Sequence, residues 1–281
     1  MKTTKLILTG IMAVLLCVTS CKKQIDNASE PESKDLGKTQ EGEWKAAYYM
    51  GSLISYQRIN GQNVFNGDMI ITDDQLSASP PKKTDVQTEG HGQNNIWPGA
   101  TIYYSISSNF NTNERSVITS AINDWANKTG LSFVSRNTGT YLRIQRGSAN
   151  NCTVGYVSNA TMNLSDPTAK GIVVHELGHA IGLHHEQLRA DRDTYIDVKW
   201  NNISQSAQSS YNIMTGLNYG GTTFDFASIM LYGSYNGYGA INSSLPTTTR
   251  KNGTTWVDPS WSGSKTPSTG DVNWVKTMYG L

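Results

Sequence analysis

The sequence predicts an α+β fold, and three patterns support this class. Short runs that alternate in polarity, such as TIYYSI at residues 101–106, are typical of strands. Residues 111–130 repeat apolar side chains at helical spacing, and residues 165–182 predict a second helix. Beyond residue 182 the chain carries neither pattern until a short helical stretch at residues 270–279, so much of the fold is expected to be irregular.

The first twenty residues are typical of a signal peptide, and we exclude them from the fold. MKTTK supplies positive charge, and the apolar run that follows is too short to span a bilayer. The run ends in VTSC, which resembles a bacterial lipobox in which Cys21 would become the lipidated first residue. The alternative is an ordinary cut nearby that leaves Cys21 as a thiol. Both alternatives predict an exported protein.

Residues 21–90 predict a propeptide. Residues 41–76 carry apolar and aromatic side chains between two polar linkers, at 22–40 and 77–95. The second linker contains the dibasic pair Lys82–Lys83, and its polar composition favours a proteolytic cut between residues 80 and 91. The alternative is a small accessory domain. Residues 91–281 would then form the catalytic domain.

Helix boundaries are predicted from caps. Asn111 or Thr112 can cap the first helix, and Gly130 stands where that helix would end. Asp166 is the expected cap of the second helix, with Pro167 in its first turn. Strands are expected at residues 131–134 and 141–145 between the two helices.

Charge and cysteine content exclude some classes of protein. The formal net charge is +1 and no run of like charges occurs, so we expect no nucleic-acid partner. Cys17 lies in the signal peptide, which leaves Cys152 without an obvious partner and predicts a fold with no disulfide framework.

The histidine content is concentrated in one stretch. Four of the five histidines lie in VVHELGHAIGLHHEQ, residues 173–187. His175 and His179 are four residues apart, so both face one side of a helix and can bind one metal ion. Gly182 permits a sharp turn after which His185 becomes a third ligand, while His184 points away.

This ligand set is that of a catalytic metal. Three nitrogen ligands with an open fourth position describe a zinc ion that activates water. Glu176 lies beside the first ligand and can take the proton of that water. The alternative is a helix with ordinary buried or exposed histidines, but the extended spacing is far more specific than the HExxH pair alone.

The zinc motif and the downstream SIMLY, residues 228–232, resemble those of the metzincins, in which Met230 would form an apolar floor under the zinc. HELGHAIGLHHEQLRADRDTY is similar to the zinc signature of the astacin family, and STGDVNWVKTMYG to its C-terminal helix. The resemblance covers roughly residues 95–281 and extends to bacterial secreted members. It implies two subdomains separated by an active-site cleft.

The astacin resemblance also implies roles for single residues. Tyr232 would be a fifth zinc ligand that swings away to stabilise the oxyanion, and Glu186 would meet the new N-terminus of the mature enzyme. FNGD, residues 65–68, is similar to the family's inhibitory motif, so Asp68 would bind zinc in the zymogen. Cys21 is an alternative blocker, since a thiolate is a strong zinc ligand.

This sequence departs from the astacin family pattern at two positions. Many family members have two disulfides in the catalytic domain, whereas this sequence has a single cysteine there, Cys152. Leu231 stands where a histidine is common in the methionine turn. Four charged residues after the zinc motif are expected to pair internally: Arg189, Asp191, Arg192 and Asp193.

The predicted function is a secreted zinc endopeptidase that is made as an inactive zymogen. Its partners would be protein or peptide substrates, its own propeptide as inhibitor, and an activating protease unless it cleaves itself. One alternative is an inactive zinc-bearing module that binds an extracellular polymer through the segment YGSYNGYG, residues 232–239. A metal-dependent amidase of another class is a third hypothesis.

Overall fold

The computed structural model describes residues 42–80, 95–217, 219, 221–262 and 265–281. These residues all belong to one compact unit. The predicted signal peptide, Cys21, Lys82–Lys83 and most of both polar linkers lie outside the described residues.

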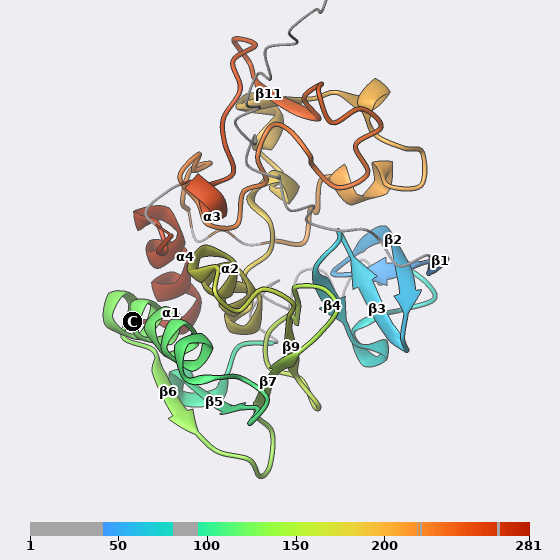
Figure 1. Ribbon diagram of the computed structural model, residues 1–281. Helices are drawn as coiled ribbons and strands as arrows, with labels where there is room; N and C mark the ends of the chain where they lie inside the picture. Colours follow the sequence, from blue (N-terminus) through green and yellow to red (C-terminus); the bar gives the residue numbers. More distant parts are fainter. Residues whose placement is uncertain (1–41, 81–94, 218, 220, 263–264) are drawn as a thin grey trace, which may run out of the picture. The chain divides into compact units, whose positions relative to one another are not determined.

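Within the described residues, nine strands form one mixed sheet in the order β1-β2-β3-β4-β8-β9-β7-β5-β6 (Figure 1). The predicted catalytic domain supplies five of them. The parallel strands β9, β7, β5 and β6 form one half, and β8 pairs antiparallel with β9. Their bounds are β5 (Thr101–Ile106), β6 (Ser132–Ser135), β7 (Leu142–Arg146), β8 (Asn151–Thr153) and β9 (Thr161–Leu164).

The other four strands come from the predicted propeptide. They form an antiparallel meander of β1 (Glu43–Tyr49), β2 (Ser52–Ile59), β3 (Gln62–Phe65) and β4 (Met69–Ile71). Strand β4 pairs in parallel with β8, so that Met69 lies opposite Cys152. Residues 42–80, which we call the N-terminal segment, therefore extend the sheet of the predicted catalytic domain through backbone hydrogen bonds.

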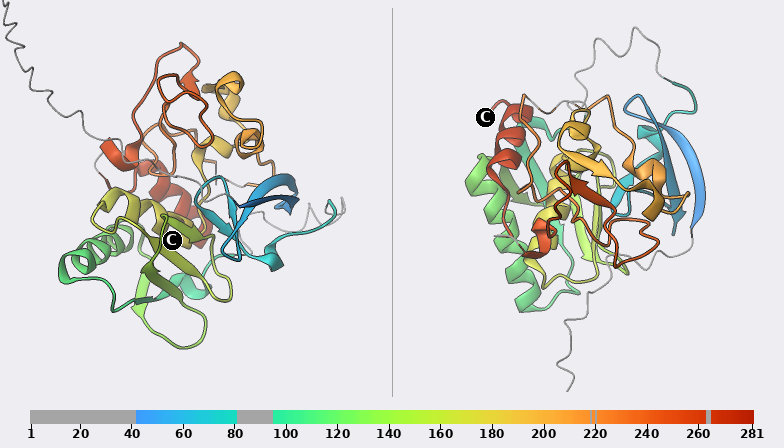
Figure 2. Two further views of the ribbon diagram at one scale, coloured as in Figure 1. Left: turned by 45° about the vertical axis from the view of Figure 1, so that its right-hand side comes forward. Right: turned by 90° about the horizontal axis from the view of Figure 1, so that it is seen from above.

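The described residues form three helices of eleven residues or more: α1 (Thr112–Thr129), α2 (Lys170–Ile181) and α4 (Thr269–Tyr279). Helix α1 packs against both α2 and α4. In the views of Figures 1 and 2, α1 and α4 lie at the side of the unit away from β1 and β2. The predicted caps of α1 are confirmed. Asn111 and Glu114 form a capping box, and Gly130 ends the helix in a left-handed conformation.

The predicted start of α2 is wrong. The helix begins at Lys170 with Ala169 as its N-cap, not at Asp166 and Pro167. The Asp166 carboxylate accepts hydrogen bonds from the backbone and hydroxyl of Thr168, and the Asp166 carbonyl accepts the N–H of Ala169. Asp166 therefore stabilises a separate turn ahead of the helix, because aspartate side chains favour local hydrogen bonds of this kind.

The chain beyond α2 is largely irregular, as predicted. It contains a short two-stranded sheet of β10 (Ile196–Val198) and β11 (Thr248–Arg250), several single turns of 3-10 helix, and the short helix α3 (Pro259–Ser262). No helix in the described parts of the chain has both the length and the apolar character to cross a membrane.

Two apolar clusters hold these layers together. The larger one lies between the sheet and helices α1, α2 and α4, and includes Trp97, Trp125 and Leu177. The second lies between the N-terminal strands and later parts of the chain, and includes Tyr49, Phe65, Leu188 and Met214. Cys152 is a buried free thiol whose pKa is raised by burial, so it behaves as a small core side chain.

Candidate metal centre

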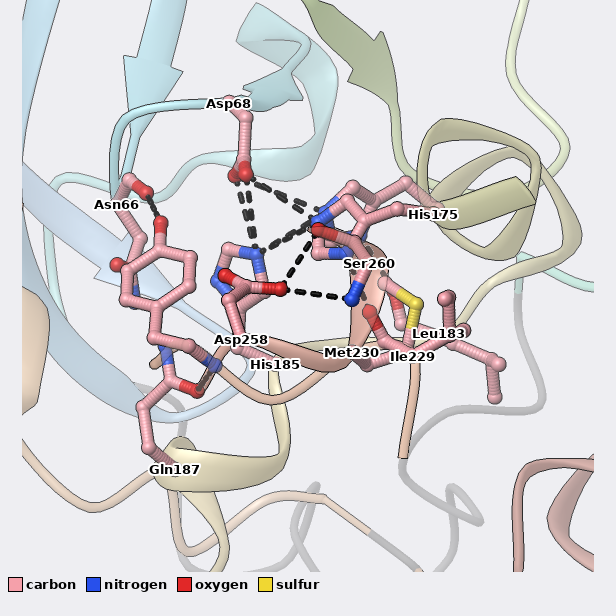
Figure 3. Close-up of polar contacts among 12 residues, drawn as sticks. Asn66, Asp68, His175, Leu183, His185, Gln187, Ile229, Met230, Asp258 and Ser260 are labelled. Atoms are coloured by element: carbon pink, nitrogen blue, oxygen red, sulfur yellow. Dashed lines mark hydrogen bonds and ion pairs between the residues drawn. The ribbon is translucent and has the colours of Figure 1, made fainter. Parts of the chain in front are cut away.

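Four side chains from three places in the sequence converge beside α2. His175 and His179 lie one turn apart on the helix, and His185 follows the turn at Gly182, whose φ of 116° suits glycine. Asp68 enters from the loop between β3 and β4 (Figure 3). Their ligand atoms all lie within 4.8 Å of one another.

The separations suit a tetrahedral ion. His185 Nε2 lies 3.2 Å from the Nε2 atoms of both His175 and His179. The Asp68 carboxylate oxygens lie 3.3 Å from His175 Nε2, 3.6 Å from His179 Nε2 and 3.2 Å from His185 Nε2. Ligands at the usual zinc bond lengths, in tetrahedral geometry, stand about 3.3 Å apart.

Hydrogen bonds on the far side of two rings set the tautomer. His175 Nδ1 lies 2.6 Å from the carbonyl oxygen of Ile229, and His179 Nδ1 lies 2.8 Å from that of Leu183. A carbonyl only accepts, so each Nδ1 carries the proton and each Nε2 has its lone pair directed at the shared point. This is the usual support of metal-binding imidazoles.

The charges also call for a cation at that point. Burial alone would raise the pKa of Asp68, but the charge of His185 and hydrogen bonds from the three imidazoles hold that pKa well below its usual range. Burial lowers the pKa of His175, yet the hydrogen bond and charge of Asp68 outweigh it and raise that pKa to about 9. A bound Zn²⁺ would supply the positive charge beside the Asp68 carboxylate that a proton on His175 otherwise provides.

Glu176 lies next to this cluster and is 2% exposed. Its Oε2 atom has no hydrogen-bond partner among the described residues. Burial and the negative charge of Asp68 raise the pKa of Glu176 well above its usual range. A buried carboxylate oxygen without a protein partner is expected where a reactant completes the site.

Met230 packs against the helix that carries two of the histidines. A Cβ atom added to Gly178 would lie 2.5 Å from Met230 Sδ, so only glycine allows this close approach. The same turn is tied to the metal centre by backbone contacts, since the Met230 carbonyl accepts the N–H of Glu186. Met230 is fully buried, as expected for an apolar floor.

The Tyr232 hydroxyl does not point at the histidines. It donates a hydrogen bond to the backbone carbonyl of Asn66, in the same loop that carries Asp68. The Tyr232 ring lies over His185, with centroids 4.4 Å apart. The expected role of Tyr232 as a fifth ligand stays a prediction, because here its hydroxyl is held by the N-terminal segment.

His184 is buried and lies outside the ligand cluster, as the spacing predicted. Its Nε2 lies 2.8 Å from the Tyr49 hydroxyl. Glu186 is also buried, accepts the backbone N–H of Asp225, and has its pKa raised to about 8 by burial. Its expected contact with a mature N-terminus stays a prediction.

The charged residues after the zinc motif pair internally, as expected. Arg189 and Asp191 are 2.8 Å apart, and Arg192 and Asp193 are 3.0 Å apart. Leu231, in the position where a histidine is common, is buried in an apolar cluster with Ile196.

Sequence reasoning missed several residues near the site. Asp258 accepts hydrogen bonds from the backbone of Gly233 and from Ser260, and Figure 3 shows it beside His175. Tyr49 and Tyr238 were also missed, although the latter donates to Gln57 of β2 at 2.9 Å. No local pattern marks Tyr49 and Tyr238, because their partners are distant in sequence, and the local bond of Asp258 to Ser260 does not indicate that Asp258 lies near the metal centre.

The helix with two histidines, the third histidine after a glycine turn, and the methionine turn below them define the metzincin class of metal site. The model of the family described as Astacin (Peptidase family M12A) matches residues 90–280. The chain therefore belongs to the astacin family, which confirms the resemblance drawn from its motifs.

Individual relatives agree with this family. Blastula protease 10 of Paracentrotus lividus is 31% identical over 272 residues, which cover 88% of this chain and 44% of that protein. Flavastacin of Elizabethkingia meningoseptica, a bacterial member, is 31% identical over 196 residues, covering 66% of this chain and 42% of that protein. The chain thus spans about half the length of the curated relatives it matches.

A solved structure shares the fold. High choriolytic enzyme 1, a hatching enzyme zinc-protease from Oryzias latipes, aligns with a TM-score of 0.59 and 25% sequence identity. The alignment covers 67% of this chain and 96% of that one. The expected α+β metzincin architecture is therefore confirmed for the astacin-like part of the chain.

Proposed function

We propose that this chain is an exported zinc endopeptidase, made as a zymogen whose N-terminal segment blocks the metal centre. The observation that carries the proposal is the convergence of three imidazole nitrogens and the Asp68 carboxylate on one point beside Glu176. Family membership supports the same reaction class.

The proposed ligands are His175, His179 and His185. Zinc bound there would act as a Lewis acid that lowers the pKa of water and polarises the carbonyl of the scissile peptide bond. Glu176 takes the proton of the attacking water and passes it to the leaving amine. The buried Oε2 atom of Glu176, which has no hydrogen-bond partner among the described residues, is available for that proton.

Tyr232 is the proposed donor to the oxyanion. Its hydroxyl donates to the Asn66 carbonyl, and loss of the N-terminal segment would free that hydroxyl for the tetrahedral intermediate. Its alternative role as fifth ligand requires the same release. Met230 would hold the ligand helix in place from below.

Latency follows from the position of Asp68. Its carboxylate would be a fourth ligand of the zinc ion that the three histidines would hold, and it would exclude the attacking water while the segment is bound. The backbone of Asp68 is fixed as well, since its carbonyl accepts the N–H of Cys152 at 2.9 Å. A cut between residues 80 and 91, by another protease or by the enzyme itself, would begin activation, after which Glu186 would receive the new N-terminus.

Export and anchoring belong to the same proposal. The signal peptide at residues 1–20 directs the chain out of the cell, and Cys21 is its candidate lipidation site. Metabolic labelling with a palmitate analogue tests this: the precursor should be labelled and Cys21→Ser should not, whereas an unlabelled precursor would contradict lipidation.

The test of activity compares the intact and linker-cut proteins on casein. The cut protein should bind one zinc ion and hydrolyse casein, lose activity with a chelator and regain it with zinc. The intact protein should bind zinc and remain silent. A cut protein that holds zinc and binds a polymer without hydrolysing casein would instead support the inactive binding module. The presence of Glu176, the proposed general base, does not favour that alternative.

A further inference from the structure

The N-terminal segment fills a second position beside the metal centre. Tyr49, the last residue of β1, is 1% exposed, and its hydroxyl lies 2.8 Å from His184 Nε2. The two residues are 135 positions apart, and their rings are tilted at 35° with centroids 5.7 Å apart. His184 directly precedes the proposed ligand His185, so the niche that holds Tyr49 adjoins the metal centre.

The polar end of this niche is the His184 ring. Its Nε2 atom lies 2.8 Å from the Tyr49 hydroxyl, and a phenol hydroxyl can donate to this nitrogen or accept from it, so it pairs with either tautomer of the ring. His184 is 3% exposed, so this nitrogen lies in a site that excludes water while it is filled.

The rest of the niche is apolar and belongs to the catalytic part of the chain. Tyr49 shares a cluster with Leu188, Met214 and Leu217, all buried. The backbone after Tyr49 is tightly seated, because a Cβ atom on Gly216 would lie 2.1 Å from the Met50 carbonyl oxygen. An apolar recess with one placed polar group is the usual form of a side-chain binding site.

We propose that this niche is a substrate subsite that takes a tyrosine side chain once the N-terminal segment leaves. The inference rests on the proposed function, and it names His184 as the residue that selects the phenol hydroxyl. The N-terminal segment occupies the metal centre through Asp68 and the niche through Tyr49, so both positions are vacated together when the segment leaves.

The chemistry of the niche predicts what it rejects. Phenylalanine fits the apolar part but leaves the buried His184 nitrogen without a hydrogen-bond partner. Phosphotyrosine has no hydroxyl proton and brings charge into an apolar recess. Tyrosine should therefore exceed both at one fixed position of the cleaved peptides.

The test profiles the active enzyme, obtained by cutting the linker of the full chain and removing the N-terminal fragment. It is incubated with peptides from a digested proteome, and the cleaved products are sequenced by mass spectrometry. At one position tyrosine should exceed phenylalanine by about 10-fold, and phosphotyrosine should be absent. His184→Leu should bring that ratio to about one, whereas His184→Gln, which keeps an acceptor, should preserve part of it.

The results that would overturn this inference alone differ from those that would also overturn the proposed function. Cleavage with no tyrosine preference, or a preference that survives in His184→Leu, would overturn this inference alone. A zinc-loaded enzyme that cleaves no peptide would overturn it together with the proposed function. A second measurement does not depend on any change at His184: Tyr49→Phe should speed release of the N-terminal fragment from the linker-cut precursor about 10-fold, and an unchanged rate would also overturn it.

Discussion

Two of the contacts between the N-terminal segment and the rest of the chain differ in their chemistry. At Asp68 the contact is ionic, with a carboxylate among three imidazole nitrogens at 3.2–3.6 Å. At Tyr49 it is a single hydrogen bond at the end of an apolar cluster. In the proposed zymogen, the first contact blocks the metal centre, while the second buries apolar surface. We therefore expect that blocking and holding can be changed separately.

The largest effect is expected at the proposed general base. Glu176→Gln removes the proposed proton acceptor while the three histidines remain. Peptide hydrolysis by the cut enzyme should fall by about 100- to 10,000-fold, the usual contribution of general base catalysis, with zinc content unchanged. Hydrolysis near the normal rate by a zinc-loaded variant would contradict the role given to Glu176.

The next largest effect is expected at His184 and His185, whose variants should differ in zinc binding. His185→Ala removes a proposed ligand and should weaken zinc binding by at least about 100-fold, more than the loss of a supporting residue does. His184→Ala should retain zinc but release the N-terminal segment faster after the linker is cut, because only the Tyr49 contact is lost. Metal analysis after dialysis checks both, and the reverse pattern would mean that the ligand set is wrong.

Changing the ionic contact alone should make the intact precursor leaky. Asp68→Asn keeps the shape of the side chain but removes its charge, and losing one partner of a buried charged pair costs about 3–5 kcal/mol. Hydrolysis of a short peptide by uncut precursor should rise by about 100-fold. Cys21→Ala serves as the comparison, with mass spectrometry to show that both are uncut. Activity in Cys21→Ala and silence in Asp68→Asn would identify the cysteine as the blocker.

Weakening the apolar contact should speed release of the N-terminal segment without making the intact precursor active. Ile54 of β2 is 2% exposed in the cluster around Tyr49, and Ile54→Ala should cost about 2 kcal/mol of packing. The intact precursor should stay silent, since Asp68 remains in place. After the linker is cut, the fragment should dissociate faster in a gel-filtration assay. An intact Ile54→Ala precursor with high activity would show that holding and blocking are not separable.

The smallest effect is expected at a site away from both contacts. Glu114 pairs with Arg146 at 2.8 Å, and hydrogen bonds from Arg146 and from the Asn111 backbone lower the pKa of Glu114. A lowered folded-state pKa contributes stability above the usual carboxyl range, and this stability is lost as the pH falls through the folded-state pKa. Glu114→Gln should slightly lower the denaturation midpoint at pH 7, with a smaller difference near pH 3. Equal differences at both pH values would contradict this linkage.

The metal centre was predictable because its information is local. The spacing of His175, His179 and His185 and the glycine between them fall within eleven residues, and helix geometry then fixes which side chains converge. The capping box of α1 was found for the same reason, since Asn111 and Glu114 are three residues apart.

The remaining features depend on contacts between distant segments. Nothing near Tyr49 indicates that its hydroxyl meets His184, and nothing near Met69 indicates that β4 pairs in parallel with β8. The start of α2 was misplaced for a related reason. Asp166 and Pro167 suit a helix start, but the side-chain hydrogen bonds of Asp166 stabilise a turn of their own instead.

The metal coordination of the intact precursor, from a crystal structure with anomalous data at the zinc edge, tests the proposed metal centre most directly. We expect one zinc ion bound by Nε2 of His175, His179 and His185 at about 2.0–2.1 Å, with an Asp68 carboxylate oxygen at about 2.0–2.2 Å. A water molecule on zinc with Asp68 turned away, or a thiolate of Cys21 in the fourth position, would contradict it.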